Sequence, residues 1–264
     1  MGIVNVTPDS FSDGGRFFDP EKAVAHALAL EQAGAEILDI GGESTRPGAQ
    51  PVTVREEIHR VVPVIRALRD VVKAELSVDT MKPEVAAAAL DAGASIINDV
   101  AAAQQNQSMW NLVAASSAGY VCMHMKGTPQ DMQISPHFDD LIGELNAFFG
   151  GRLDRLASAG VQADQVVLDV GLGFGKTDNH NLQLLAEITA FTKWGRPLLL
   201  GASRKSFMGR VLGSAIPDRL PASLACATWG VMQGVQILRV HDVAGTVQAV
   251  RMTEAIRGNE SKRC

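Results

Sequence analysis

Residues 91–100 read DAGASIINDV, and residues 32–42 read QAGAEILDIGG. Each stretch starts with an Ala-Gly pair at the end of a helix-like segment and continues as a short apolar run that ends in polar residues. A glycine just past a helix supplies the left-handed backbone position that satisfies the last carbonyls of that helix. An apolar run of this length, bounded by glycine, is typical of a buried strand. The same phrase returns with Ala-Gly at 118–119 and 159–160, so the chain repeats a helix–strand unit.

Counting every such unit gives eight expected strands. They cover residues 2–7, 36–41, 75–79, 95–100, 120–125, 166–171, 197–201 and 235–241. Helical patterns separate them, and Asp19 followed by Pro20 is a typical helix start. Eight βα units at a spacing of roughly 30 residues match a single (β/α)8 TIM barrel that spans residues 1–264. An open, doubly wound sheet remains the alternative, because periodicity does not distinguish a closed sheet from an open one.

Composition excludes several classes of protein. The net charge of −5 and the pI near 5.7 argue against a nucleic-acid or membrane-surface partner. No apolar run reaches the roughly 18 residues of a membrane span, and no signal peptide precedes the first strand. The three cysteines are widely spaced and form no zinc pattern, which favours a reducing, cytoplasmic location.

Polar residues close nearly every expected strand, where the active site of a parallel α/β fold forms. They are Asn5, Asp39, Asp79, Asn98, His124, Asp169, residues 203–205, Arg239 and His241. Strand ends are often polar, but that tendency does not explain a near-complete ring of carboxylates, amides and cations within Val/Ile/Leu runs. Acceptors and amide donors at fixed spacing suit a planar heterocycle with several N–H groups.

Two pairs of cationic side chains extend this ring. Arg239 and His241 are two residues apart, hence on one strand face, and make a plausible oxyanion- or phosphate-binding pair. Residues 198–207 read LLLGASRKSF, an apolar strand followed by a cationic and hydroxylic run. Adjacent Arg204 and Lys205 suit an anionic or electron-rich ligand. A solvated strand-to-helix loop with ordinary surface charges is the alternative for this stretch.

Residues 171–177, GLGFGKT, look like a nucleotide-binding loop. They do not form a Walker A motif, because Val170 occupies the required first glycine position, and the third glycine is misplaced for a dinucleotide fingerprint. We interpret the segment as a mobile, Gly-rich active-site loop, with a plain turn as the alternative. Residues 7–15 and 41–48 are also long loops at the strand ends, so we expect them to act as lids.

Eight blocks together carry a resemblance to a known family. They read NVTPDSFSDGG (5–15), DIGGESTRPGA (39–49), SVDTMKPEVA (77–86), IINDV (96–100), MHMKGTPQDMQ (123–133), GFGKT (173–177), GASRKSF (201–207) and RVHDV (239–243). In this order they resemble the dihydropteroate synthase family over residues 2 to 243. Single blocks such as IINDV are weak, whereas TPDSFSDGG, ESTRPG and SRKSF together are highly specific.

The resemblance implies a TIM barrel that joins 6-hydroxymethyl-7,8-dihydropterin pyrophosphate to p-aminobenzoate, giving dihydropteroate and pyrophosphate. It also implies a homodimer, a Mg²⁺ cofactor and a sulfonamide target. The residues carried over for the pterin are Asp79, Asn98, Asp169 and Lys205. Those for the p-aminobenzoate pocket are Phe11, Arg46, Pro47, Phe174, Lys205 and Ser206. Thr45, Arg239 and His241 would bind the pyrophosphate, and Asn5 would contact Mg²⁺. The residues expected to act directly in catalysis are Lys205, Arg239, His241, Thr45 and Arg46.

Two other functions stay open. A methyltetrahydrofolate methyltransferase shares the Asp and Asn positions that hold a pterin, but methyl transfer involves no pyrophosphate for Arg239 and His241 to bind. A non-catalytic pterin-binding paralogue is the second alternative. Such a protein would be expected to lose residues such as Asn5, Thr45 or Lys205, and all three are present.

Overall fold

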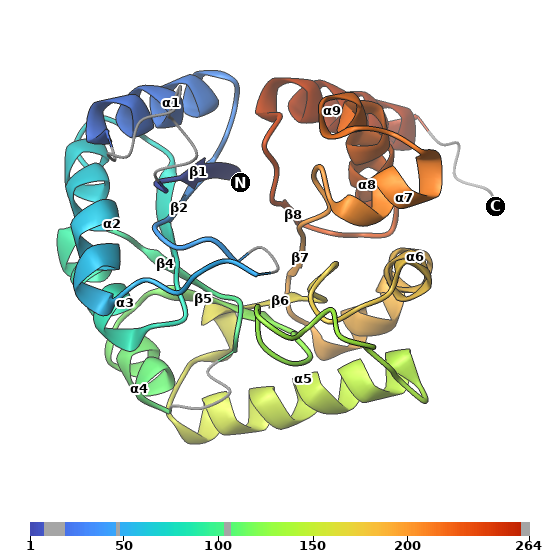
Figure 1. The fold of residues 1–264 in the computed structure, drawn as a ribbon, viewed down its shortest axis with the longest axis horizontal. Coiled ribbons are helices and arrows are strands. Elements are labelled where there is room, and N and C mark those ends of the chain that lie inside the picture. The colour runs from blue at the N-terminus through green and yellow to red at the C-terminus, as the bar shows by residue number, and fades with distance from the viewer. Residues whose placement is uncertain (8–18, 46–47, 103–106, 260–264) are drawn as a thin grey trace.

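The computed structural model describes residues 1–7, 19–45, 48–102 and 107–259 of the chain. Its centre is an eight-stranded parallel sheet whose strands follow one another in chain order (Figure 1). The strands are β1 (Gly2–Asn5), β2 (Ile37–Gly41), β3 (Glu75–Asp79), β4 (Ile96–Asp99), β5 (Gly119–Met123), β6 (Val166–Asp169), β7 (Leu198–Leu200) and β8 (Ile237–Leu238). All eight predicted strands are therefore present.

The first strand meets the segment that follows the last strand. Gly2 forms a parallel bridge with Val240, the Ile3 amide donates to the Val240 carbonyl at 3.0 Å, and the Val240 amide donates to the Met1 carbonyl at 3.0 Å. These bonds close the ring of strands as a (β/α)8 barrel requires. The strand β8 is shorter than the predicted 235–241, although the Gln236 and Arg239 amides on either side of it donate to the Leu198 and Leu200 carbonyls of β7 at 3.1 and 3.0 Å.

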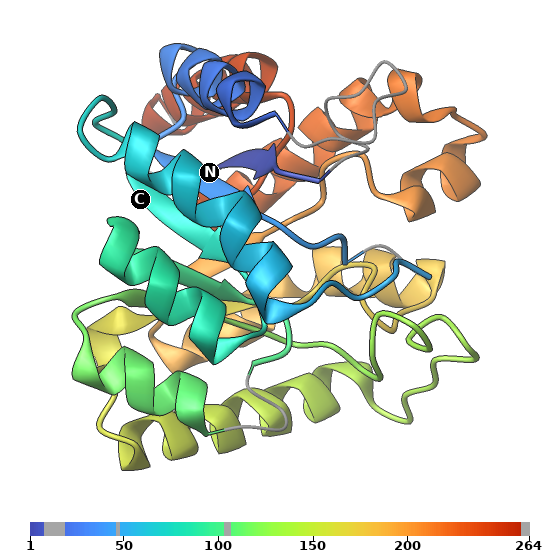
Figure 2. The same cartoon turned by 60° about the vertical axis from the view of Figure 1, so that its left-hand side comes forward.

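Helices cover the outside of the sheet, and Figure 2 shows α1, α2, α3 and α4 following one another around it. The α-helices that the structure describes are α1 (Pro20–Gln32), α2 (Val54–Leu68), α3 (Pro83–Ala92), α4 (Ser108–Ala115), α5 (Leu141–Ser158), α6 (Asp178–Ala186), α7 (Ser206–Leu212), α8 (Leu220–Met232) and α9 (Val243–Gly258). Short 3-10 helices cover Ala163–Gln165, Ile188–Trp194 and Ile216–Arg219. Within these ranges no helix combines the length and the apolar character needed to cross a bilayer.

Local signals in the sequence account for most helix ends. Asp19 accepts hydrogen bonds from the amides of Glu21 and Lys22 at 3.0 and 3.3 Å, so the predicted start of α1 is confirmed. Gly34 and Gly93 adopt positive φ values of 101° and 121° just past α1 and α3, as the Ala-Gly phrase predicts. The prediction is wrong at Gly119, which lies inside β5, where its amide donates to the Ser95 carbonyl at 2.9 Å.

Candidate active site at the carboxyl ends of the strands

Two carboxylates and one guanidinium form the buried centre of the strand-end ring. Nε of Arg239 lies 2.6 Å from Oδ2 of Asp39 in β2, and Nη2 lies 2.6 Å from Oδ2 of Asp79 at the end of β3. Burial lowers the pKa of Arg239, but the two carboxylates raise it more, so it lies above its ordinary value. This ion-pair network links the segment after β8 to β2 and β3, which lie beyond β1 in the closed barrel.

Asp39 was predicted as a member of the strand-end ring, but the sequence assigned it no binding role. Its Oδ1 accepts from the Ser77 hydroxyl at 2.6 Å, and its Oδ2 accepts from Nδ2 of Asn98 at 3.0 Å as well as from Arg239. The side chain is completely buried. The sequence signal for these contacts was an aspartate between two apolar strand residues. A carboxylate buried there without a hydrogen-bond partner would cost free energy, so partners were to be expected. Asp39 thus fixes the orientation of Asn98 and Arg239.

Asp79 keeps one carboxylate oxygen without a partner among the residues that the structure describes. Its Oδ1 is buried and accepts no hydrogen bond from the described residues. Burial, opposed by Arg239, raises the pKa of Asp79 to about 7. Buried carboxylate oxygens are normally hydrogen-bonded, so an orphaned one in a ring of strand ends suggests a place for a ligand donor.

Asp169 ends β6, and Lys205 lies in the loop between the neighbouring strand β7 and α7. Asp169 accepts from the Gly171 amide at 2.8 Å, and burial nevertheless raises the pKa of its carboxyl. Burial and repulsion from Arg239 lower the pKa of Lys205 to about 8, with Asp169 and Asp79 opposing that shift. The Lys205 ammonium also lies 4.3 Å from the centre of the Phe174 ring, in a cation–π contact. The structure therefore brings Lys205 together with the predicted pterin and p-aminobenzoate residues.

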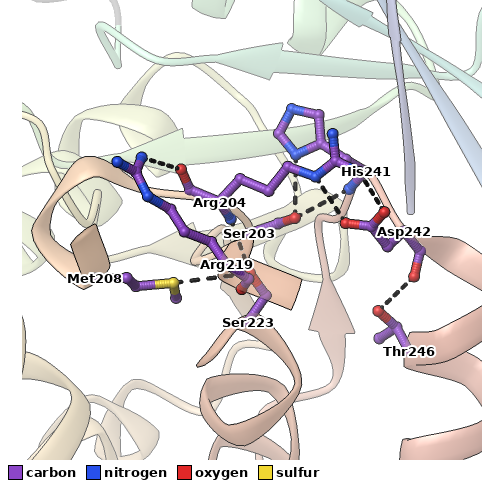
Figure 3. A network of polar contacts seen from close by, with 8 residues as sticks. All are labelled: Ser203, Arg204, Met208, Arg219, Ser223, His241, Asp242 and Thr246. Atoms are coloured by element: carbon purple, nitrogen blue, oxygen red, sulfur yellow. Dashed lines mark hydrogen bonds and ion pairs between the residues drawn. The ribbon is translucent and has the colours of Figure 1, made fainter. Parts of the chain in front are cut away.

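The neighbouring Arg204 has a different role from Lys205. It adopts a positive φ of 56°, and its guanidinium forms an ion pair with Asp242 (Figure 3). Its amide donates to the Ser223 hydroxyl at 2.9 Å, and its carbonyl accepts from Nη1 of Arg219 at 3.2 Å. The two adjacent cations expected at one ligand are thus separated. Arg204 fixes the β7–α7 loop, and of these two adjacent cations only Lys205 interacts with the aspartates at the strand ends.

His241 lies beside the same loop. The Ser203 hydroxyl contacts both the amide and Nδ1 of His241, at 3.2 and 3.0 Å (Figure 3). Burial, together with Arg239 and Arg204, lowers the pKa of His241 to about 4. The imidazole is therefore neutral at neutral pH, so any contact it makes with an anion is a hydrogen bond, while Arg239 supplies the positive charge.

The Gly-rich segment after β6 packs closely on the end of β5. A β-carbon at Gly171 would collide with the carbonyl oxygen of His124, and Gly171 has a φ of 64° that favours glycine. Nζ of Lys176 contacts Nδ1 of His124 at 2.9 Å and donates to the Phe174 carbonyl at 3.0 Å. These bonds argue against the mobility that we expected for this loop. The expected ring member His124 therefore contacts Lys176, a residue that the sequence analysis did not single out.

The other predicted site residues are found as follows. Asn5 ends β1 and pairs in register with Gly41 at the end of β2. Thr45 is half-buried in the loop after β2, and Ser206 is exposed at the first position of α7. Phe11, Arg46 and Pro47 lie outside the described residues, so their roles stay predictions.

The loop that carries Thr45 is attached at its base. Oε1 of Glu43 accepts from the Val52 amide at 3.1 Å, and Oε2 accepts from Nζ of Lys82 at 2.5 Å. Lys82 also donates to the fully buried Glu57 at 2.5 Å. This second buried ion-pair network joins the loop after β2 to the start of α3.

Comparison with known proteins gives one consistent result. The family model described as "Pterin binding enzyme" matches residues 1–241. The dihydropteroate synthase of Escherichia coli (strain K12) is 47% identical, and the alignment covers 100% of this chain and 93% of that protein. A solved Yersinia pestis dihydropteroate synthase in complex with a sulfonamide drug is 46% identical, with a TM-score of 0.92 over 97% of this chain and 93% of that one. The Xanthomonas albilineans dihydropteroate synthase solved with 4-aminobenzoic acid is 46% identical, with a TM-score of 0.91 over 97% and 92% of the two chains. The chain therefore belongs to the pterin-binding enzyme family, within its dihydropteroate synthases.

Proposed function

We propose that this protein joins 6-hydroxymethyl-7,8-dihydropterin pyrophosphate to p-aminobenzoate, releasing pyrophosphate and 7,8-dihydropteroate. The observation that carries the proposal is the set of buried Asp79, Asn98 and Asp169 together with the partly buried Lys205 at the carboxyl ends of the strands, with Oδ1 of Asp79 left for a ligand. The family membership and the ligands named for the solved relatives support the same reaction.

The pterin is proposed to lie against these four side chains. A pterin ring presents several N–H groups and ring nitrogens in one plane, and the two carboxyls and the amide offer matching acceptors and donors. Asp79 and Asn98 pair in register on β3 and β4, while Asp169 approaches from β6. The lowered pKa of Lys205 leaves it able to donate to the ring at neutral pH, since it is protonated below about 8.

The p-aminobenzoate pocket is proposed to form at the outer edge of the same site. Phe174 beside Lys205 supplies an aromatic wall, and Ser206 at the start of α7 supplies an exposed hydroxyl. Phe11, Arg46 and Pro47, predicted from the sequence, would complete this pocket from the two early loops. The solved relative bound to 4-aminobenzoic acid supports a site for this substrate in the family.

The pyrophosphate is proposed to contact Arg239, His241 and Thr45. Mg²⁺ is proposed to accompany it, since this ion commonly binds through one or two protein oxygens together with substrate phosphates. Asn5 offers an amide oxygen at the end of β1, and the described residues contain no cluster of three or more His, Cys, Asp or Glu suited to a dedicated metal cage. When bound, Mg²⁺ would supply positive charge that stabilises the departing pyrophosphate.

The reaction needs no activated protein nucleophile. The C–O bond between the pterin methylene and the pyrophosphate breaks, and both electrons leave with the pyrophosphate. The electron-rich pterin stabilises the cationic methylene, which the arylamine nitrogen attacks before losing a proton. Arg239 stabilises the charge on the leaving group, and the neutral His241 donates a hydrogen bond. Closure of the loops after β1 and β2 would exclude water that otherwise traps the cation.

A homodimer and a cytoplasmic location are also proposed. Exposed apolar side chains gather on the adjacent helices α8 and α9, where Trp229, Met232, Met252 and Ile256 are 44–62% exposed. Exposed apolar side chains on neighbouring helices support an interaction surface here. Sedimentation of the wild type and of Met252→Glu tests the dimer, which fails if the wild type sediments as a monomer at micromolar concentration.

Pyrophosphate release from the purified protein tests the reaction. Release that requires p-aminobenzoate and Mg²⁺, with dihydropteroate formed, is the expected result. Pterin binding without turnover would instead support the non-catalytic paralogue. A requirement for a cobalamin partner would support the methyltransferase.

A further inference from the structure

Lys176 is the one buried lysine in the parts of the chain that the structure describes, and only 1% of it is exposed. Its ammonium forms no salt bridge with a described carboxylate. Burial lowers the pKa of Lys176 to about 7, so the side chain is only partly protonated at neutral pH, and hydrogen bonds compensate for the water that it has lost. The contacts of Lys176 therefore need an explanation that ordinary packing does not provide.

Each N–H of the Lys176 ammonium has an acceptor. Nζ lies 2.9 Å from Nδ1 of His124, 3.2 Å from the His124 carbonyl oxygen and 3.0 Å from the Phe174 carbonyl oxygen. His124 accepts at Nδ1 because its imidazole is neutral, since burial and the neighbouring Lys176 lower its pKa to about 2. Three donors thus meet three acceptors on two segments, the end of β5 and the turn after β6.

The turn after β6 depends on this attachment. It contains Gly171, Gly173 and Gly175, all with positive φ, so its backbone conformation is one that favours glycine. The backbone at Gly175 approaches the Lys126 carbonyl so closely that a β-carbon would collide with it. Three buried side chains hold the turn from the inside. Asp169 accepts from the Gly171 amide at 2.8 Å, Asn181 accepts from the Gly173 amide at 2.7 Å, and Lys176 donates to the Phe174 carbonyl at 3.0 Å. On the exposed side, Gln133 donates to the Gly173 carbonyl at 2.6 Å.

We propose that Lys176 is a positioning residue for the p-aminobenzoate subsite. It holds the carbonyl of Phe174 and thereby sets the position of the Phe174 ring beside Lys205. This inference rests on the proposed function, in which Phe174 lines the p-aminobenzoate pocket. Three of the four proposed pterin contacts lie outside this turn, since Asp79, Asn98 and Lys205 lie on β3, β4 and the β7–α7 loop. The fourth, Asp169, accepts from the Gly171 amide at the start of the turn, whereas the bond from Lys176 to the Phe174 carbonyl lies further along it.

The test is a comparison of the two Michaelis constants in Lys176→Met. Methionine fills a similar volume but donates no hydrogen bond, so the turn is released without a large cavity. We expect the KM for p-aminobenzoate to rise at least about fivefold, while the KM for dihydropterin pyrophosphate changes less than about twofold, a split that reports separable binding effects. Unchanged KM values for both substrates would overturn the proposal. A fall in kcat alone would also overturn it, because loss of a merely structural residue lowers the fraction of active protein. Equal rises in both KM values would overturn it as well, because they would show that the whole site is disturbed.

Three further variants make the test decisive. Lys193→Met, at an exposed lysine, is the matched control and should behave as the wild type. Lys176→Gln keeps two donors, should give an intermediate KM for p-aminobenzoate, and replaces Lys176→Met if that variant does not fold. Phe174→Leu should raise the same KM, and the double variant Lys176→Met/Phe174→Leu should add little, since both changes act on one group. Additive effects would overturn the inference.

The outcomes also separate this inference from the proposed function. No turnover by the wild-type protein would remove the proposed reaction itself. Wild-type turnover together with an unchanged KM in Phe174→Leu would instead overturn the subsite and the role of Lys176, leaving the reaction in place.

Discussion

Nη2 of Arg239, just after β8, lies 2.6 Å from Oδ2 of Asp79 at the end of β3. The same guanidinium binds Asp39 through Nε, so one side chain joins three segments of the barrel at its active-site end. This arrangement ties the proposed pyrophosphate-binding cation to the proposed pterin-binding carboxylate. A change in either partner should therefore affect both substrate contacts and stability.

Asp39→Asn should separate positioning from direct binding. The amide keeps the shape of the carboxylate but weakens the bonds to Arg239 and Asn98, so both groups lose their fixed orientation. We expect turnover to fall by about 10- to 100-fold, the scale of a misplaced catalytic group. We also expect the free energy of unfolding to fall by about 1–3 kcal/mol, as for a weakened buried hydrogen bond to a charged group. Steady-state kinetics and urea unfolding measure the two effects.

Ser77→Ala is the control for that variant. It removes the hydroxyl that donates to Oδ1 of Asp39 but leaves the ion pair with Arg239 intact. A loss of stability of about 1 kcal/mol with nearly normal turnover is expected. Equal kinetics for Asp39→Asn and Ser77→Ala would show that Asp39 does not orient Arg239.

Lys205→Ala and Arg204→Ala should differ although the residues are neighbours. Lys205 faces Asp79 and Asp169, whereas Arg204 pairs with Asp242 at a partly exposed position. We expect Lys205→Ala to weaken pterin binding by about 10- to 100-fold with the fold intact, the scale of a lost charge-assisted hydrogen bond. Arg204→Ala should change pterin affinity less than about threefold, since an exposed ion pair contributes little. Calorimetric titration with a pterin measures both, and near-normal binding by Lys205→Ala would remove Lys205 from the site.

The pKa of Lys205 predicts how pterin binding depends on pH. Since the ammonium of the free protein loses its proton near pH 8, affinity should fall as the pH rises from about 7 to 9.5. Lys205→Arg keeps its charge over this range and should show a flatter profile. Binding titrations at fixed ionic strength provide the comparison, and parallel profiles for the two proteins would assign the pH dependence to another group.

The same group should affect stability in the opposite direction. Burial lowers the pKa of Lys205 to about 8 from the ordinary value of 10.5, so the unfolded chain binds more protons between these two pH values. Stability attributable to Lys205 therefore rises as the pH rises through this window. The gain should disappear in Lys205→Met, which urea unfolding at pH 7 and pH 9.5 can show.

The sequence predicted the fold because strand and helix signals alternate with little ambiguity. Apolar runs mark all eight strands, and all of these runs except that of β3 are preceded or followed closely by glycine. The polar residues that close the strands converge because parallel strands end on one face of the sheet. Asp79, Asn98 and Asp169 could be assigned to the site for the same reason. What the sequence could not predict is which oxygen of Asp79 is left unpartnered, since that depends on Arg239, a residue 160 positions further along the chain.

Local sequence was also insufficient where neighbouring residues of one type diverge. Arg204 and Lys205 look equivalent in the SRKSF block, but the positive φ at Arg204 and its partner Asp242 direct them to different environments. Lys176 resembles a phosphate-binding lysine of a nucleotide loop, yet it is buried against His124 because the glycines bring the backbone of the turn onto the end of β5. Both outcomes depend on tertiary contacts.

Lys82→Met should release the loop that carries Thr45. Lys82 bridges Glu43 and the fully buried Glu57, and these bonds hold the pKa of Lys82 above its ordinary value although burial lowers it. Removing the ammonium leaves two carboxylates unpaired, so we expect the free energy of unfolding to fall by about 3–5 kcal/mol. Urea unfolding measures this loss, and Lys22→Met, at a lysine whose side chain is 59% exposed, is the control that should change stability by less than about 0.5 kcal/mol.

If Lys82→Met is as stable as Lys22→Met, the network does not anchor the loop. If it is destabilised as expected, the double variant Lys82→Met/Glu57→Gln should recover part of the loss, because one of the unpaired charges is then removed.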